Sequence, residues 1–415
     1  MQPIVASSGG DMLVTLRSNY PSLWPEFLAK NWPDLGRGGG GVKSTGYDKP
    51  VDPALIQAFG EPAVVPWTQR VTSTDPERTL LKKPNYSSYP YAESVKGMLA
   101  YAAQPQHARI GEKKRPKTVR KLVKTLPQVL GMYQVPIGNL KKHTQHPVVV
   151  PKDASYSVSR HTWRYGSGAV GQALLAKPKD QLPGPRKGLI VALHGCSSSP
   201  DKLLGMGAED YAHRYAQKAV QAGWWVLVPF HLNYCQWLND YDRMLALGSG
   251  TTAMGYELMV IRRMVQWLVI NRGPFAPRHV WGISKGGRLA MTLAAMDGGY
   301  HTIVVSGNMV YDETTPVKTP LDDFRKLRLR GDGRLEEMWR RIGSENMIKA
   351  ILPRRVILEM GAYEKYLEDQ VGTIQRLQSY VKRNYPKKDP LTVRFFKGYH
   401  ETDGAKILEL LAQGP

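Results

Sequence analysis

The spacing of hydrophobic residues changes part-way along the chain. From Ala154 onward, short apolar runs typical of buried strands alternate with stretches in which apolar residues recur at helical spacing. Before that point, prolines and glycines interrupt the chain and no hydrophobic period is sustained. The pattern predicts a folded domain over residues 154–415, preceded by an extended arm over residues 1–153 with short helices near 22–31 and 91–103.

Within the predicted domain, a β-hairpin comes first and strands then alternate with helices. The hairpin is expected over 155–180. Further strands are expected at 188–193, 224–231, 279–281, 302–308, 356–360 and 391–396. Helices are expected near 208–222, 252–271, 289–294, 370–383 and 405–411. This alternation predicts an α/β protein with a doubly wound, mostly parallel sheet, in which residues 311–352 form an insertion or cap.

One stretch, from His279 to Asp297, has the pattern of a strand, a sharp turn and a helix. Ser284 lies in the turn, with Gly282 and Gly286 two residues to either side. A Cβ at either glycine would collide with the neighbouring strand or helix. The turn holds the serine hydroxyl at the amino end of a helix, where backbone N–H groups favour a developing anion. Ser284 is therefore a candidate nucleophile.

Three other stretches supply the groups that such a serine needs. The strand at 188–193 ends in His194 and Gly195, where an oxyanion-binding N–H would follow. A later apolar strand ends at Gly361, and Glu364 lies three residues beyond it. The last strand is followed by a loop that carries His400. Serine, acid and histidine therefore occur in the chain order of α/β-hydrolases.

With these motifs, residues from about 154 to 412 resemble the α/β-hydrolase superfamily, and especially its dienelactone-hydrolase and acetyl-xylan-esterase-like branch. The resemblance rests on the motifs LHGCSSSP, GISKGG, PRRVILEMGAYE and FFKGYHETDG. It implies that Ser284 is the nucleophile, that His400 is its general base, and that Glu364 orients His400. The family usually has Asp at the acid position, so Glu359 and Asp369 stay open as alternatives.

The resemblance also implies an oxyanion hole and an activity. The oxyanion would be held by the backbone N–H groups of Lys285 and Cys196, and the reaction would be cleavage of a carboxylic ester or thioester. The sequence contains no metal-ligand cluster, nucleotide-binding glycine loop or cofactor motif, so neither a metal nor a cofactor is expected. An inherited, inactive elbow serine stays open as an alternative.

Net charge points to a second class of function. The chain has 57 Lys and Arg residues against 35 Asp and Glu, and residues 101–187 alone contain 17 basic and 3 acidic residues. A basic amphipathic helix is predicted within 111–130, and it could bind a polyanion such as RNA or pack on its own protein. The candidate partner-binding residues are Lys113, Lys114, Arg115, Lys117, Arg120, Lys121, Lys124, Lys141 and Lys142. The alternative function is a structural, RNA-contacting subunit of a large ribonucleoprotein, such as an organellar ribosome.

Cysteine usage and hydropathy indicate the cellular compartment of the protein. Cys196 and Cys235 are far apart and have neither metal nor redox spacing, which favours a reducing compartment. The first residues match neither a secretory signal nor a presequence. No run approaches 18 apolar residues, so no membrane span is expected. We therefore expect an intracellular protein of the cytoplasm or mitochondrial matrix, not a secreted one.

Overall fold

A computed structural model gives the arrangement of the folded part of the chain. The structure describes residues 63–64, 126–130, 132, 137–179, 187–195, 198–207, 209–231, 251–273, 275–307, 342–364 and 367–414. The two short helices expected in the arm, both cysteines and most of the expected insertion lie outside the described residues.

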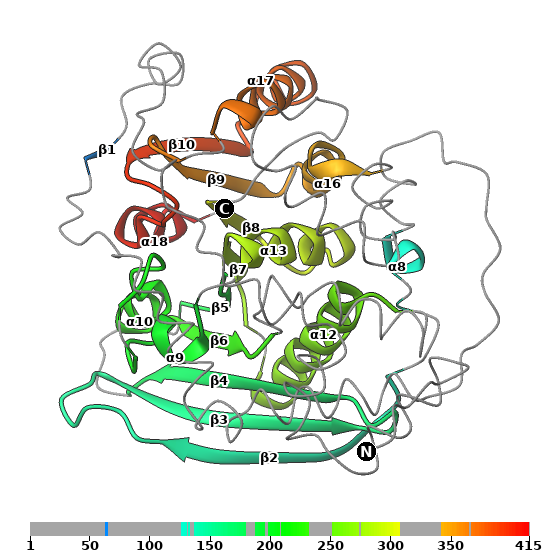
Figure 1. Ribbon diagram of the computed structural model, residues 1–415, viewed down its shortest axis with the longest axis vertical. Helices are drawn as coiled ribbons and strands as arrows, with labels where there is room; N and C mark the ends of the chain where they lie inside the picture. Colours follow the sequence, from blue (N-terminus) through cyan, green and yellow to red (C-terminus); the bar gives the residue numbers. More distant parts are fainter. Residues whose placement is uncertain are drawn as a thin grey trace, which may run out of the picture.

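A ten-stranded sheet crosses the described part of the molecule (Figure 1). Its order is β1 (Ala63–Val64), β10 (Leu391–Lys397), β9 (Arg355–Gly361), β8 (Thr302–Ser306), β7 (Arg278–Ile283), β5 (Leu189–Leu193), β6 (Trp225–Pro229), β4 (Val170–Pro178), β3 (Tyr156–Tyr165) and β2 (Leu140–Val148). Neighbours from β1 to β6 are parallel, and β6, β4, β3 and β2 pair antiparallel. The predicted hairpin and the mostly parallel sheet are confirmed.

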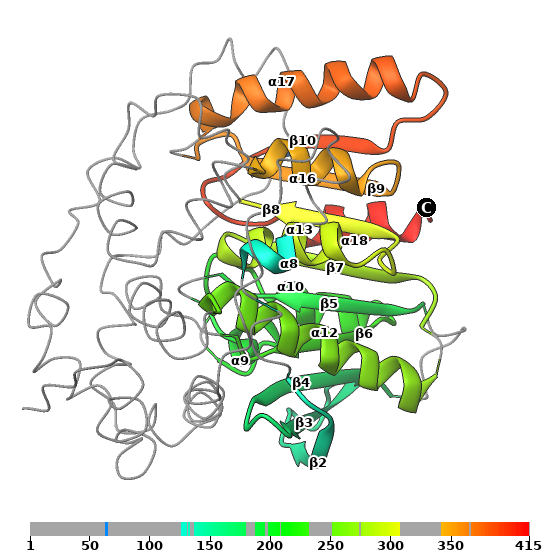
Figure 2. The same cartoon turned by 90° about the vertical axis from the view of Figure 1, so that its right-hand side faces the viewer.

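Helices cover both faces of the sheet (Figures 1 and 2). One face carries α9 (Pro200–Leu203), α10 (Tyr215–Gln221) and α18 (Gly404–Ala412). The other carries α12 (Ala253–Arg272), α13 (Lys285–Met296), α16 (Gly343–Ile351), α17 (Leu367–Asn384) and the short α8 (Leu126–Val129). Because side chains alternate along a strand, Leu189 and Val191 of β5 enter one core while Ile190 and Ala192 enter the other. The predicted doubly wound architecture is confirmed.

The sheet extends into the segment that the sequence assigned to the arm. Strand β2 pairs with β3, so the antiparallel part of the sheet starts at Leu140 and not near Ala154. Leu126 and Leu130 are fully buried, and the Leu130 carbonyl accepts a hydrogen bond of 3.1 Å from the N–H of Thr252. Strand β2 lacks a hydrophobic pattern because it is an edge strand and most of its residues are exposed.

The helix expected over 208–222 is shorter than predicted. Helix α10 begins only at Tyr215, because His213 and Arg214 have left-handed backbone conformations with φ of 49° and 52°. Residues 209–214 therefore form an irregular segment before the helix. Among the described residues, no helix combines the length and apolarity needed to cross a membrane.

Candidate active site

The winding of the sheet changes direction at β5. The chain passes from β5 to β6 through α9 and α10 on one face, and from β6 to β7 through α12 on the other. In open α/β sheets, such a switch point leaves a crevice outside the carboxyl ends of the strands, where ligands bind. Strands β5 and β7 are neighbours, so Gly195 and Ser284, which follow them, lie at this edge of the sheet.

Ser284 lies in a strained turn between β7 and α13. Its backbone has φ of 56° and ψ of −122°, a combination that residues with a side chain rarely adopt. A Cβ at Gly282 would collide with the carbonyl oxygen of Gly286, and a Cβ at Gly286 would collide with that of Leu193. Both glycines are therefore required for the turn, as the sequence predicted. The chain has the α/β-hydrolase fold.

His400 and Glu364 meet at the carboxyl ends of β10 and β9 of this hydrolase fold. The distance between His400 Nδ1 and Glu364 Oε1 is 2.8 Å, with the carboxylate buried and the ring part-exposed. A carboxylate only accepts hydrogen bonds, so Nδ1 carries the proton and Nε2 is the basic nitrogen. A Cβ at Gly307 would lie 3.4 Å from His400 Nδ1. The backbone carbonyl oxygen of the preceding residue, Ser306, accepts a hydrogen bond of 2.9 Å from the backbone N–H of Ser284. The ring therefore lies against the segment that anchors the serine.

Of the three acids considered, the structure brings Glu364 to His400. Glu359 is fully buried in a different network, and burial raises its pKa. Its carboxylate accepts hydrogen bonds from Thr402, Ser306, Arg394 and the N–H of Asp403. The side chain of Asp369 lies outside the described residues. Glu359 therefore stabilises the loop that follows His400 through these hydrogen bonds.

Lys285 contributes a side chain that sequence reasoning missed. Its backbone N–H follows Ser284 at the start of α13, and its buried ammonium lies 2.9 Å from Oε1 of Glu257 on α12. The His231 ring lies 4.0 Å from the same carboxylate oxygen and stacks on His194, with 3.6 Å between ring centroids. This buried ionic cluster supports the residue that follows Ser284. Sequence spacing could not reveal it, because α12 and α13 meet only in the folded chain.

Tyr211 is a second residue at the site that the sequence did not indicate. A Cβ at Gly195 would lie 3.0 Å from the Cβ of Ser284 and would collide with the Tyr211 hydroxyl. The Tyr211 ring also lies 5.7 Å from the His400 ring, measured between centroids. Residue 211 fell inside an expected helix and carries no motif, so no local signal could have found it.

The predicted partner-binding residues are mostly beyond the described part of the chain. Lys141 and Lys142 are exposed on the edge strand β2. The others, namely Lys113, Lys114, Arg115, Lys117, Arg120, Lys121 and Lys124, lie outside the described residues, as does the oxyanion candidate Cys196. Among the described residues, no three His, Cys, Asp or Glu side chains are grouped so that they could hold a metal ion.

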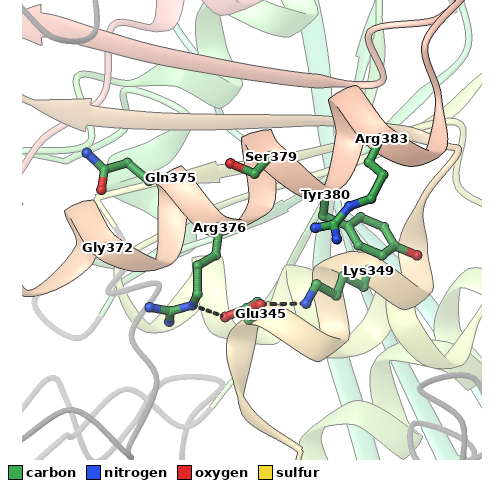
Figure 3. Close-up of a pocket in the computed structure, with 8 residues that line it drawn as sticks. All are labelled: Glu345, Lys349, Gly372, Gln375, Arg376, Ser379, Tyr380 and Arg383. Atoms are coloured by element: carbon green, nitrogen blue, oxygen red, sulfur yellow. Dashed lines mark hydrogen bonds and ion pairs between the residues drawn. The ribbon is translucent and has the colours of Figure 1, made fainter.

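A cavity of about 440 Å³ lies between α16 and α17 (Figure 3). Its lining residues are Glu345, Lys349, Gly372, Gln375, Arg376, Ser379, Tyr380 and Arg383. Glu345 pairs with Lys349 at 2.5 Å and with Arg376 at 2.8 Å. The cations of this cavity are thus partly neutralised by a carboxylate within it, and we assign it no catalytic role.

Known proteins resemble this chain in structure but not in sequence. No protein-family model matches the chain, and no curated protein matches it in sequence. An acetyl xylan esterase from Paenibacillus sp. is similar with 13% identity and a TM-score of 0.48, over 74% of this chain and 96% of that one. Acetyl xylan esterase 1 from Thermoanaerobacterium sp. has 14% identity and a TM-score of 0.46, over 72% and 94%. A glucuronoyl esterase from Teredinibacter turnerae has 14% identity and a TM-score of 0.47, over 70% and 82%. The fold assignment rests on this chain's own sheet order and on the turn at Ser284.

Proposed function

We propose that this chain is a serine hydrolase that cleaves a carboxylic ester or thioester. The observation that carries the proposal is the hydrogen bond of 2.8 Å between His400 and Glu364, next to the segment that anchors the strained Ser284. Glu364 and His400 are 36 residues apart in the chain, and the fold brings them together. Their hydrogen bond places the proton of the imidazole on Nδ1 and leaves Nε2 able to accept a proton, as a general base requires. A nucleophile in a strained turn, a histidine and an orienting acid together form the arrangement that acyl transfer uses.

The reaction proceeds in two halves. Ser284 Oγ attacks the acyl carbon while its proton passes to Nε2 of His400, and Glu364 stabilises the imidazolium that forms. The C–O or C–S bond then breaks, and the leaving group takes the proton from His400. In the second half, water attacks the acyl carbon while its proton passes to Nε2 of His400. The bond between the acyl carbon and Ser284 Oγ then breaks, Oγ takes the proton back from His400, and the carboxylic acid leaves. The oxyanion is held by the N–H groups of Lys285 and Cys196, each contributing about 3 kcal/mol to transition-state stabilisation.

The proposal is tested by labelling the full chain with a fluorophosphonate probe. Wild type and Ser284→Ala are compared with Ser379→Ala, which removes a hydroxyl on α17 as a matched control. We expect wild type and Ser379→Ala to be labelled equally and Ser284→Ala not at all. Absence of labelling in a wild-type protein that circular dichroism shows to be folded would overturn the proposal.

The charge of the segment before the sheet supports a second candidate. Residues 101–187 contain 17 basic and 3 acidic residues, which an esterase with a small substrate does not need. The second candidate is an RNA-contacting subunit in which the hydrolase fold is a scaffold; the two functions are compatible. The two cysteines favour a reducing compartment for either function.

The RNA candidate is tested by substitution, because deletion of residues 101–150 would also remove β2. A variant with the nine basic candidates changed to Gln is compared with wild type by filter binding to single-stranded RNA over a range of salt. Each phosphate that the variant no longer neutralises is expected to reduce the slope of log affinity against log salt by about 0.7. Lys382→Gln on α17 is a single-charge control. Absence of salt-dependent RNA binding by wild type would contradict this candidate.

A further inference from the structure

The end of β5 leaves a space beside Ser284 that a side chain from another part of the chain fills. Residue 195 is a glycine, and a Cβ there would stand 3.0 Å from the Cβ of Ser284. The same Cβ would collide with the hydroxyl oxygen of Tyr211. The phenol oxygen therefore occupies the position that any side chain at residue 195 would take, directly beside the nucleophile. It can reach this position only because residue 195 has no side chain.

An ion pair joins the segment around Tyr211 to the loop that carries His400. Two residues after Tyr211, Nε2 of His213 lies 2.6 Å from Oε2 of Glu401, which follows His400. The other carboxylate oxygen of Glu401 accepts a hydrogen bond of 2.8 Å from the N–H of Tyr399. Burial opposes a charged imidazole, but the hydrogen bond and the charge of Glu401 outweigh it and raise the pKa of His213. The Tyr211 segment and the His400 loop are therefore joined by an ion pair.

A second anchor fixes the other end of the segment to the sheet. The Tyr215 hydroxyl is fully buried and donates to the carbonyl oxygens of Leu193 on β5 and Trp281 on β7, at 3.1 and 3.2 Å. His213, the first anchor, and Arg214, which precedes the second, keep left-handed backbone conformations that are unfavourable for residues with a side chain. Strained conformations of this kind persist where the surrounding contacts over-determine them, and they concentrate at functional sites.

We propose that Tyr211 is a further catalytic residue, whose hydroxyl donates a hydrogen bond to the oxyanion that forms when Ser284 attacks an acyl carbonyl. The inference rests on the proposed hydrolase function. A phenol O–H can donate, and a hydrogen bond to a charged oxygen is stronger than one to a neutral carbonyl. The interaction therefore stabilises the transition state more than the bound substrate, which raises the rate of the chemical step. No proton is transferred from Tyr211 in this role.

The test removes the hydroxyl and keeps the ring. Tyr211→Phe and the wild-type full chain are compared with Tyr380→Phe, which removes a phenol oxygen on α17 at the cavity of Figure 3. Three quantities are measured across the pH range in which the proteins are folded: kcat and KM for p-nitrophenyl acetate, and the second-order rate constant of fluorophosphonate labelling at Ser284. Circular dichroism melting of each variant sets an assay temperature at which every protein is folded.

We expect Tyr211→Phe to lower kcat and the labelling rate about 10- to 100-fold, with KM changed less than about twofold and the shape of the pH profile unchanged. Tyr380→Phe should behave as wild type. Equal rates for Tyr211→Phe and wild type would overturn the assignment and leave the serine hydrolase in place. A shifted pH profile with an unchanged plateau would also overturn it, because Tyr211 would then act by positioning His400. Absence of Ser284-dependent labelling in folded wild type would overturn the hydrolase proposal and this inference with it.

Discussion

Individual residues at the candidate site are constrained by steric contacts and by single hydrogen bonds. The turn at Ser284 stores strain on the order of 1–3 kcal/mol, and it exists because Gly282 and Gly286 leave room for a carbonyl oxygen each. Two of the buried glutamates near the site, Glu364 and Glu359, differ in their partners. Glu364 faces His400, whereas Glu359 faces Arg394 and hydroxyl groups. The two carboxylates should therefore have separable effects.

Glu364→Gln is expected to lower kcat for ester hydrolysis about 10⁴-fold while the melting temperature stays close to that of wild type. An amide in place of the carboxylate favours the wrong tautomer of His400 and does not stabilise its charged form. Glu359→Gln is the matched control, and it should lower the melting temperature because Arg394 loses the charge of one of its two carboxylate partners, the fully buried one. Steady-state kinetics and thermal melting of both variants show which carboxylate acts on His400. A loss of kcat confined to Glu359→Gln would show that the acid is misassigned.

At the scale of elements, buried polar groups join helices and strands whose apolar faces form the cores. The ion pair between Glu257 and Lys285 joins α12 to α13 at the residue that follows Ser284. His279 lies on the central strand β7, where it is almost fully buried against Trp224. The free energy of unfolding therefore depends on whether Glu257 and Lys285 remain paired, and on whether His279 binds a proton.

Glu257→Ala is expected to reduce the free energy of unfolding by about 3–5 kcal/mol, because it leaves the Lys285 ammonium buried without this partner. The double variant Glu257→Met with Lys285→Met should recover most of that loss, since it removes both charges of this pair from the core. Urea unfolding of wild type and both variants measures the difference. A double variant no more stable than Glu257→Ala would contradict the idea that the uncompensated charge causes the loss.

Acid should destabilise the fold through His279. Burial first, and then the charges of His301 and Arg355, lower its pKa from 6.5 to about 4. Between these values the unfolded chain binds a proton that the folded chain does not, so the free energy of unfolding falls as the pH falls below 6.5. At pH 5 this one residue costs about 2 kcal/mol relative to neutral pH.

The measurement is urea unfolding at several pH values for wild type, His279→Leu and His146→Gln. The loss of stability between pH 7 and pH 5 should be smaller in His279→Leu by about 2 kcal/mol. His146 is exposed on β2, and its replacement should leave the pH dependence as in wild type. An unchanged pH dependence in His279→Leu would show that this residue is not the origin of the effect.

For the whole molecule, the folded unit begins earlier than hydrophobic periodicity indicates. Strand β2 covers the edge of β3 along its length, and Leu126, Leu130 and Ile137 belong to the core on the α12 side of the sheet. These residues precede the domain that the sequence delimits at Ala154. The segment before the hydrolase domain is therefore partly a structural component of the sheet.

A chain starting at residue 126 loses only the two-residue strand β1 from the sheet and should keep the cooperative thermal unfolding of the full chain. A chain starting at residue 154 should melt at a markedly lower temperature. The second truncation exposes the edge of β3 and removes the buried side chains of Leu126, Leu130 and Ile137, each contributing about 1.5–3 kcal/mol by its burial. Circular dichroism melting of both truncated chains against the full chain is the measurement. Equal melting temperatures for the two truncated chains would contradict a structural role for residues 126–148.

Local patterns in the sequence determined the α/β class, the order of strands and helices, the turn at Ser284, and the loops that carry Glu364 and His400. These features could be predicted because a buried parallel strand is apolar throughout, and because the turn cannot form without glycine at residues 282 and 286. Both signals are contained in a few consecutive residues.

Only the tertiary structure decided which acid meets His400, that Lys285 pairs with Glu257, that β2 belongs to the sheet, and that Tyr211 reaches the site. The first two depend on contacts between side chains far apart in the chain, which leave no periodic signal. Strand β2 is an exposed edge and has no hydrophobic pattern to detect. Tyr211 is placed by two strained residues and an ion pair to Glu401, 188 residues after His213, so its position exists only once both loops are folded together.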